Sequence, residues 1–348
     1  MKVGFIGLGN VFPLHLNAVR SLTEVDIVGC HDTESRRLIA AQELGLPAYR
    51  ELPKLFANKP DIIHVLVPPQ HHVRVATFAL EQGANCFLEK PAALSLQGVE
   101  ELISASSLAG KKIAVNHNQL FNPGFLRAVK MIRDRRIGGL EHVHVHYELS
   151  LSFGADHFAL KDPANMIWEL APHPLSLIYD LLGSVQSVRA QPLGAKDSQT
   201  SWRRWQATLA CDRGSASCYV SSSASHEDLH MTISGEDGSI YVDLLRGTAC
   251  ALTKHFEMPL ADALYTSVRH SMSLLCQSVG SACFAMSRLF TDHQLKDPYN
   301  RSLSTSICNF YASLRNGGNP LCDMKHAEAI VQACEMTVQA LKKSGNSA

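Results

Sequence analysis

Hydrophobic positions in the first 118 residues recur with two different periods. Short apolar runs, which predict buried strands, lie at residues 3–6, 24–31, 61–69, 85–91 and 111–118. Segments with helical spacing follow these runs, and residues 71–83 and 94–110 are examples that end in glycine. Alternation of this kind is typical of a doubly wound parallel sheet. The sequence therefore predicts an N-terminal α/β domain over residues 1–118.

The pattern changes after residue 118 to a strict alternation of polar and apolar side chains. In HVHVHYELSLSF, His142, His144 and His146 lie on one face of the expected strand. Further strands are expected at residues 204–211, 215–223, 229–235 and 239–245, with Asp237-Gly238 as a hairpin turn. We predict a second α/β domain, residues 119–348, built on an open and mostly antiparallel sheet. The histidine spacing also fits a metal site, but no carboxylate or cysteine accompanies it, and we predict no metal.

A glycine turn joins the first expected strand to the first expected helix in GFIGLGNVFPLH. Gly7 permits a tight turn, and Gly9 lets the backbone approach a pyrophosphate. The amides that open the helix, at Asn10 and Val11, form an anion site. Phe12 replaces the third glycine of the usual pattern, so the signal taken alone also fits a plain turn.

Asp32 follows the second expected strand at the distance where an acidic residue binds the ribose of a dinucleotide. A carboxylate here favours NAD, because it repels the 2′-phosphate of NADP. Arg36 and Arg37 lie close behind and weaken that preference, which leaves NADP possible. The alternative role for Asp32 is the N-cap of a helix over residues 33–45, and the two roles can coexist.

Composition limits the classes of partner. The chain has 32 basic and 32 acidic side chains, so no strong electric field attracts nucleic acid. No apolar stretch is long enough to cross a membrane. Ten scattered cysteines without a C-x-x-C pair are typical of reduced thiols, and we predict a cytoplasmic protein.

Several motifs resemble the Gfo/Idh/MocA family of nicotinamide-dependent oxidoreductases. They are GLGNVFPLH, VPPQHH, EQGANCFLEKPAALSLQGVEEL, VNHNQLFNPGFLRAVKMI, WELAPHPLSLIYDLLG, GEDGSIYVDL and NFYASLRNGGNPLCDMKHAEAI. The resemblance implies a Rossmann domain and a second α/β domain that helps to form the substrate cleft. It also implies hydride transfer between the nicotinamide and a hydroxyl or keto carbon of a sugar, a cyclitol or a nucleotide-linked sugar.

The same resemblance suggests the catalytic pair. Lys90 in the EKP motif would hydrogen-bond the reacting oxygen, although a lysine here also fits an exposed loop. His173 would be the base, in the first turn of a helix whose dipole favours a neutral imidazole; the alternative is a structural histidine. Glu169 stands where the family usually has an aspartate.

The remaining predicted site residues follow from position. Pro68, His72 and Glu89, with Lys90, are expected near the cofactor, and Glu169, Asn118 and Asn165 near the substrate. Residues 156–168 are expected to form a loop over the cleft, with Asp156 and His157 as further candidate contacts.

One stretch lies outside the minimal architecture that the family resemblance implies. Residues 260–290 predict one or two helices of low charge, which would pack against the sheet or a neighbouring subunit, or line the site of a large substrate. We expect a homodimer or homotetramer formed through the C-terminal sheet. Two other functions remain open: an enzyme that uses tightly bound NAD for non-redox epimerisation, dehydration or glycoside cleavage, and a non-enzymatic dinucleotide sensor.

Overall fold

The structure is a computed structural model that describes residues 1–154, 157–193, 202–287 and 298–346. The chain divides into two compact units. The first unit contains Met1–His117 and Leu303–Gln332, and the second contains Asn118–Ser302 and Ala333–Ala348. The predicted ranges, 1–118 and 119–348, differ from this grouping because a C-terminal segment packs with the first unit.

The first unit is built on a parallel sheet of six strands in the order β3-β2-β1-β4-β5-β6. The strands are β1 (Lys2–Ile6), β2 (Asp26–His31), β3 (Ala48–Tyr49), β4 (Ile62–Val65), β5 (Asn85–Leu88) and β6 (Ile113–Val115). Each of the five predicted apolar runs overlaps one of these strands. The predicted doubly wound Rossmann sheet is confirmed.

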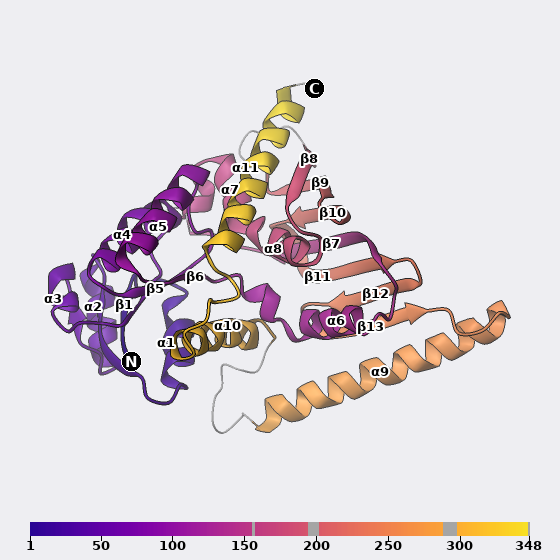
Figure 1. Ribbon diagram of the computed structural model, residues 1–348, viewed down its shortest axis with the longest axis horizontal. Helices are drawn as coiled ribbons and strands as arrows, with labels where there is room; N and C mark the ends of the chain where they lie inside the picture. Colours follow the sequence, from indigo (N-terminus) through magenta and orange to yellow (C-terminus); the bar gives the residue numbers. More distant parts are fainter. Residues whose placement is uncertain (155–156, 194–201, 288–297, 347–348) are drawn as a thin grey trace. The chain divides into compact units, whose positions relative to one another are not determined.

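Helices alternate with these strands along the chain (Figure 1). They are α1 (Phe12–Arg20), α2 (Ser35–Glu43), α3 (Leu52–Phe56), the short η1 (Pro69–His71), α4 (His72–Glu81) and α5 (Leu96–Ala109). Two further helices follow much later in the chain, α10 (Pro298–Arg315) and α11 (Met324–Asn346). Phe310 and Tyr311 of α10 join a core cluster with Phe5 and Phe87 of the sheet. This packing explains why residues 303–332 belong to the first unit.

The second unit is built on a seven-stranded sheet in the order β13-β12-β11-β7-β10-β9-β8. The strands are β7 (Leu140–Ser150), β8 (Val185–Pro192), β9 (Arg204–Cys211), β10 (Gly214–Ser221), β11 (Ser223–Gly235), β12 (Gly238–Asp243) and β13 (Thr248–Thr253). The β10–β7 pair is parallel and the other pairs are antiparallel, as the prediction of a mostly antiparallel sheet requires. In β7, Val143, Val145 and Tyr147 are buried, and the histidines between them face the other side.

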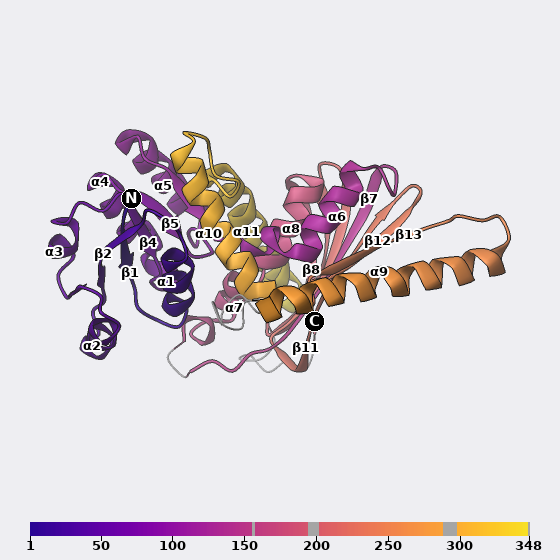
Figure 2. The ribbon, with the colours of Figure 1, turned by 90° about the horizontal axis from the view of Figure 1, so that it is seen from below.

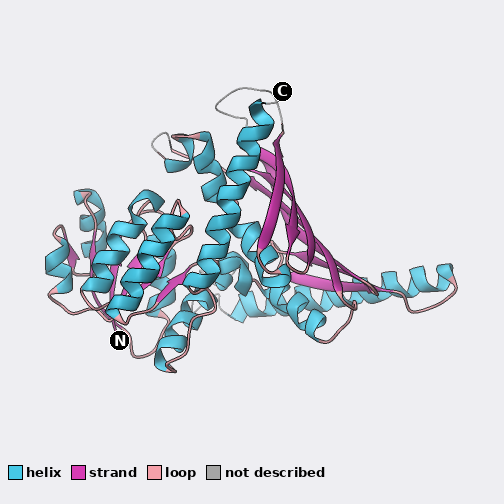
Figure 3. Ribbon diagram, turned by 45° about the horizontal axis from the view of Figure 1, so that its top comes forward, coloured by secondary structure: helices cyan, strands magenta, loops and turns pink. Residues whose placement is uncertain are grey.

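Helices pack on one face of this second sheet (Figure 3). α6 (Pro123–Arg133) lies against β12 and β13, and α8 (Pro172–Leu182) lies against β7 and β10. The short η2 (Asn118–Phe121) packs beside both helices.

The predicted loop over residues 156–168 is wrong, because this segment is largely helical. The described part forms η3 (Phe158–Leu160) and most of α7 (Pro163–Leu170). Asp162 caps α7, since its side chain accepts the amide hydrogen of Ala164 at 2.7 Å, and a proline then occupies the first helical position. Asp156 lies outside the described residues.

A single long helix, α9 (Pro259–Ser287), accounts for the described part of the segment 260–290 (Figure 2). Among the described residues, none of the helices combines the length and the apolar character that a bilayer span requires.

Candidate functional site

The glycine turn after β1 has the geometry that a dinucleotide site needs. Gly7 has φ +95°, and a Cβ there would lie 2.7 Å from the carbonyl carbon and oxygen of Leu66. A Cβ at Gly9 would meet nothing within 4 Å, so the backbone is open at this point. Val11, the residue before α1, makes no side-chain cap hydrogen bond. The first amide of α1, that of Phe12, donates to the carbonyl oxygen of Gly9 at 3.1 Å, so the helix begins directly at the glycine turn, where its positive end favours an anion.

Phe12, at the position of the missing third glycine, is buried against the sheet. Its ring meets the ring of Phe5 edge to face, with the centroids 5.4 Å apart. The larger side chain therefore fills the contact between α1 and β1 with an aromatic pair.

Asp32 lies at the end of β2 and is 5% exposed. Its Oδ2 accepts the amide hydrogen of Leu8 and its Oδ1 accepts that of Glu34, both at 2.8 Å. Burial opposes ionisation, but these amides and the guanidinium of Arg37 lower the pKa of Asp32 below its ordinary value. The carboxylate is thus ionised and fixed beside the glycine turn. The alternative role as a helix N-cap is wrong, because the residue before α2 is Glu34.

The two arginines behind Asp32 differ in their contacts. Arg37 lies 3.3 Å from Asp32 and 3.0 Å from Glu34, whereas Arg36 pairs with Glu34 alone at 2.7 Å. Arg36 is the more exposed of the two. Arg37 therefore offsets part of the negative charge of Asp32, while Arg36 remains nearer to solvent.

A buried row of hydrogen bonds, which we call the histidine chain, crosses the first unit and ends at Glu89. Tyr311 Oη lies 2.8 Å from His64 Nε2, and His64 Nδ1 lies 2.9 Å from His15 Nδ1. His15 Nε2 then lies 2.8 Å from Glu89 Oε1, which also accepts a hydrogen bond from Asn116 at 2.7 Å. His15 and His64 are fully buried. The histidine chain therefore fixes the carboxylate next to Lys90 from inside the protein.

The partners determine where the hydrogens lie in the histidine chain. An ionised Glu89 only accepts, so His15 Nε2 donates to it. With neutral imidazoles, His64 Nδ1 then donates to His15, and Tyr311 donates to His64. Burial, with the nearby His15, lowers the pKa of His64 well below its ordinary value, which keeps His64 neutral. Burial opposes the ionisation of Glu89, but hydrogen bonds from His15 and Asn116 and the charge of Lys90 lower its pKa to about 2.

Lys90 follows Glu89 after the carboxyl end of β5 and precedes a cis peptide bond to Pro91. His72 lies beneath this turn and is fully buried. Its Nδ1 is 2.7 Å from the carbonyl oxygen of Pro91, and its Nε2 is 2.8 Å from that of Val67. His72 thus ties the turn after β4, where Pro68 precedes η1, to the turn after β5. A role of His72 toward a cofactor would be indirect, because both ring nitrogens face these carbonyls.

In the second unit, His173 lies in the first turn of α8 and is 8% exposed. Its ring stacks on Tyr147 of β7, with centroids 5.5 Å apart and an interplanar angle of 18°. Burial raises the pKa of the Tyr147 hydroxyl. The second unit therefore brings His173 and Tyr147 together, while Glu169 lies on α7, the helix that precedes α8.

The other predicted substrate residues are bonded within the second unit. Asn118 is 1% exposed, and its Nδ2 donates to Ser302 Oγ at 3.0 Å. Asn165 Nδ2 donates to the carbonyl oxygen of Phe158 at 3.0 Å. His157 Nδ1 accepts the amide hydrogen of Ala159 at 3.2 Å. These hydrogen bonds give each of the three side chains a structural role within the second unit.

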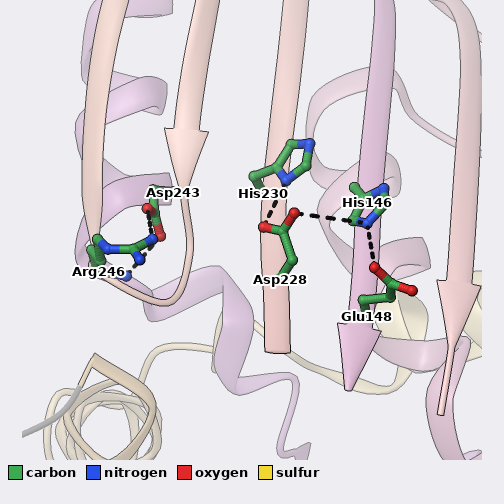
Figure 4. A network of polar contacts seen from close by, with 6 residues as sticks. All are labelled: His146, Glu148, Asp228, His230, Asp243 and Arg246. Atoms are coloured by element: carbon green, nitrogen blue, oxygen red, sulfur yellow. Dashed lines mark hydrogen bonds and ion pairs between the residues drawn. The ribbon is translucent and has the colours of Figure 1, made fainter. Parts of the chain in front are cut away.

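The face of the second sheet opposite α6 and α8, which we call the uncovered face because no helix among the described residues packs over it, carries a polar network (Figure 4). His146 and His230 stack with centroids 4.7 Å apart, on neighbouring strands. His146 Nε2 lies 3.1 Å from Glu148, and His230 Nδ1 lies 3.0 Å from Asp228. Within the part of the chain that the structure describes, no group of three or more His, Cys, Asp or Glu residues is arranged to hold a metal ion.

Sequence reasoning missed two members of the histidine chain. A signal for His64 was present in the sequence, because it is a histidine within the apolar run of residues 61–69. An imidazole in a buried strand has no water to bond to and therefore needs partners within the protein. Tyr311 lies 247 residues further along the chain, and no local pattern connects the two.

Comparison with known proteins identifies the family. Residues 1–117 match the description "Oxidoreductase family, NAD-binding Rossmann fold", and residues 125–241 match "GFO/IDH/MocA C-terminal domain". The chain belongs to the Gfo/Idh/MocA oxidoreductase family. Its first unit is thus an NAD-binding Rossmann domain of this family.

Several relatives are named dehydrogenases. A 1-carboxy-3-chloro-3,4-dihydroxycyclohexa-1,5-diene dehydrogenase of Comamonas testosteroni is 29% identical over 148 residues, 41% of this chain and 37% of the relative. D-apiose dehydrogenase of Paraburkholderia graminis is 25% identical over 193 residues, 54% of this chain and 52% of the relative. The chain thus spans about a third to a half of the length of these two curated relatives.

A third relative is similar in sequence and in structure. UDP-N-acetylglucosamine 3-dehydrogenase of Acidithiobacillus ferrooxidans is 24% identical over 259 residues, 71% of this chain and 75% of the relative. A solved structure of that enzyme superposes with a TM-score of 0.76 over 99% of both chains, at 18% identity. At this identity, the structural likeness shows the fold.

Proposed function

We propose that the protein is an NAD-dependent dehydrogenase or reductase that acts on a hydroxyl or keto carbon of a sugar-like substrate. The observation that carries the proposal is the partly buried Glu89, held by hydrogen bonds from His15 and Asn116 immediately before Lys90, beyond the carboxyl end of β5. Ligands of open parallel sheets bind beyond the carboxyl ends of the strands. Membership of an oxidoreductase family with an NAD-binding Rossmann fold supports the same chemistry.

In this proposal each side chain has a stated task. Bound NAD supplies the site that accepts or donates the hydride. Lys90 donates a hydrogen bond to the reacting oxygen and stabilises negative charge that develops there. The imidazole of His173 accepts the hydroxyl proton during oxidation and returns it during reduction. Glu169, four residues before His173, orients a neighbouring hydroxyl group.

Cofactor preference rests on the surroundings of Asp32. Its ionised carboxylate favours the ribose hydroxyls of NAD and disfavours a 2′-phosphate. A carboxylate has about four lone-pair sites, so the three donors around Asp32 leave room for one more hydrogen bond. Gly7, Gly9, Asn10 and Val11 would hold the pyrophosphate.

Substrate class, assembly and location stay predictions. A relative named UDP-N-acetylglucosamine 3-dehydrogenase supports a nucleotide-linked sugar, and one named D-apiose dehydrogenase supports a free sugar. The uncovered face of the second sheet supports a homodimer or homotetramer. Ten cysteines, all free in the structure, support a reducing, cytoplasmic environment.

A hydride-transfer screen tests the proposal. The full-length protein is incubated with NAD and a panel of sugars, cyclitols and UDP-sugars, and NADH absorbance is followed. The Lys90→Met and His173→Asn variants should each lose at least about a hundredfold in kcat with the active substrate. Lys59→Met, at an exposed lysine of the same unit, is the control and should keep full activity.

The same preparation distinguishes the two other functions. NAD that copurifies at one equivalent and is reduced and reoxidised within one turnover would indicate a non-redox enzyme. NAD binding without turnover on any substrate, unchanged by Lys90→Met, would indicate a sensor.

A further inference from the structure

Helix α9 directs its polar side chains toward the edge of the second sheet. Gln277 Nε2 donates to the carbonyl oxygen of Ala249 at 2.8 Å, and Gln277 Oε1 accepts the amide hydrogen of the same residue at 2.9 Å. His270 Nε2 lies 2.9 Å from the carbonyl oxygen of Ala251. Both alanines belong to β13, the last strand in the sheet order, so α9 bonds to a strand edge that would otherwise be open. Figures 1 and 2 show α9 running beside β13.

The other side of α9 exposes large apolar side chains, which we call the outer stripe. Its members are between 44% and 69% exposed: Leu260, Leu264, Tyr265, Val268, Met272, Leu275, Val279 and Met286. At about 100° per residue, the outer stripe is centred about 180° from His270 and Gln277. The helix is therefore amphipathic in the reverse sense, with its polar face bonded to the sheet and its apolar face in solvent.

Charge is absent from the outer stripe. The acidic and basic residues of α9 are Asp262 and Arg269, and both lie more than about 90° from the centre of the stripe. A helix that binds a membrane surface usually carries several Lys or Arg residues on its polar face. The polar face of α9 instead bonds to β13, and a protein partner fits this pattern better.

The outer stripe is large enough for a stable interface. α9 has 29 residues, which correspond to about 43 Å of helix. Eight large side chains, each about half exposed, present on the order of 700 Å² of surface. A standard protein interface buries about 800 Å² on each partner.

We propose that α9 packs through its outer stripe against α9 of a second copy of this chain, as an antiparallel pair around a two-fold axis. A continuous and uncharged stripe is complementary to itself, as an isologous interface requires. Most spacings in the stripe are three or four residues, which forms the ridges that pack helix against helix. This surface is separate from the uncovered face of the sheet, and the inference does not depend on the proposed enzymatic function.

Sedimentation equilibrium of the full-length protein tests the proposal. The variant Val268→Glu with Leu275→Glu places two charges on the outer stripe. The control, Ser267→Glu with Ser278→Glu, places the same charges at exposed positions about 80° to 100° from the centre of the outer stripe. The stripe variant should have half the wild-type mass, from dimer to monomer or from tetramer to dimer, and the control should keep the wild-type mass.

Two results would overturn the inference. One is equal mass for the wild type, the stripe variant and the control, with circular dichroism showing all three folded. The other is a monomeric wild type that floats with phosphatidylcholine vesicles, which would assign the stripe to a membrane surface. If the glutamate variant does not fold, Val268→Ser with Leu275→Ser replaces it and should weaken self-association at least tenfold.

Discussion

The two sheets of this protein use histidine in opposite ways. In the first unit, His64 of the parallel sheet and His15 of α1, which packs on that sheet, are fully buried, and their ring nitrogens have partners within the protein. In the antiparallel sheet of the second unit, His144, His146 and His230 lie on an uncovered face beside serines, carboxylates and one another. A sheet buried on both faces has no water to satisfy a polar group, so burial there demands a fixed network.

This difference indicates which histidine positions tolerate substitution. The histidine chain fixes Glu89, and through it the turn that carries Lys90, so a lost member leaves a buried polar atom without its partner. The uncovered face has solvent as an alternative partner. We therefore expect substitutions in the histidine chain to be costly and substitutions on the uncovered face to be mild.

The largest effect is expected for His15→Leu. The partly buried carboxylate of Glu89 would keep Asn116 but lose its histidine donor, which should lower the free energy of unfolding by about 3 kcal/mol. Urea denaturation measures the loss. The double variant with Glu89→Gln removes the charge and should recover part of it; an equal or larger loss in the double variant would contradict the hydrogen bond assigned from His15 to an ionised Glu89.

Acid should destabilise the first unit through its buried histidines. The folded pKa of His64 lies well below 6.5 and that of His326 is lowered by burial to about 4, so below pH 6.5 the unfolded chain takes up protons that the folded chain does not. Above pH 6.5 the free energy of unfolding should not depend on these groups. As the pH is lowered from 6.5 to 4, the free energy of unfolding should fall by about 1.4 kcal/mol per pH unit for each histidine.

Urea denaturation at several pH values checks this dependence. The His64→Phe variant should show a smaller slope than the wild type between pH 6.5 and 4. The same slope in both proteins would mean that His64 takes up a proton in the folded state.

A smaller loss is expected for Tyr311→Phe, which removes one hydroxyl and keeps the ring. His64 Nε2 would lose its donor, at a cost of about 1–2 kcal/mol. A shift in the urea midpoint reports this value. Phe310→Tyr is not a suitable control, because it buries a new hydroxyl.

The smallest effect is expected for His144→Ala on the uncovered face. The side chain bonds to Ser217 Oγ at 2.9 Å, and water can replace it there. The free energy of unfolding should change by less than about 0.5 kcal/mol. A loss above about 2 kcal/mol in the same urea assay would show that this face is as constrained as the histidine chain.

Local patterns predicted much of the fold. The alternation in residues 142–153 predicted the buried Val143 and Val145, and the apolar runs predicted five parallel strands. The segment before Trp168 was misjudged, because its capping Asp162-Pro163 pair was not weighed as a helix start. The packing of α10 with the first unit could not be predicted from local patterns, because it depends on contacts between residues far apart in the sequence, such as those of Phe310.

The candidate site was predicted unevenly for similar reasons. Gly7, Asp32 and Lys90 sit at strand ends, where motif spacing carries information. Asn118 and Asn165 were chosen by position alone, and the structure shows them hydrogen-bonded within the second unit. His64 and Tyr311 required three-dimensional contacts, because no sequence period links them.

Calorimetric titration of the purified full-length protein with NAD and with NADP tests the central claim most directly. The account predicts one NAD site per chain, with a Kd for NAD at least about tenfold lower than that for NADP, a difference of about 1.4 kcal/mol. Absence of binding by either cofactor, in a protein that circular dichroism shows to be folded, would contradict it.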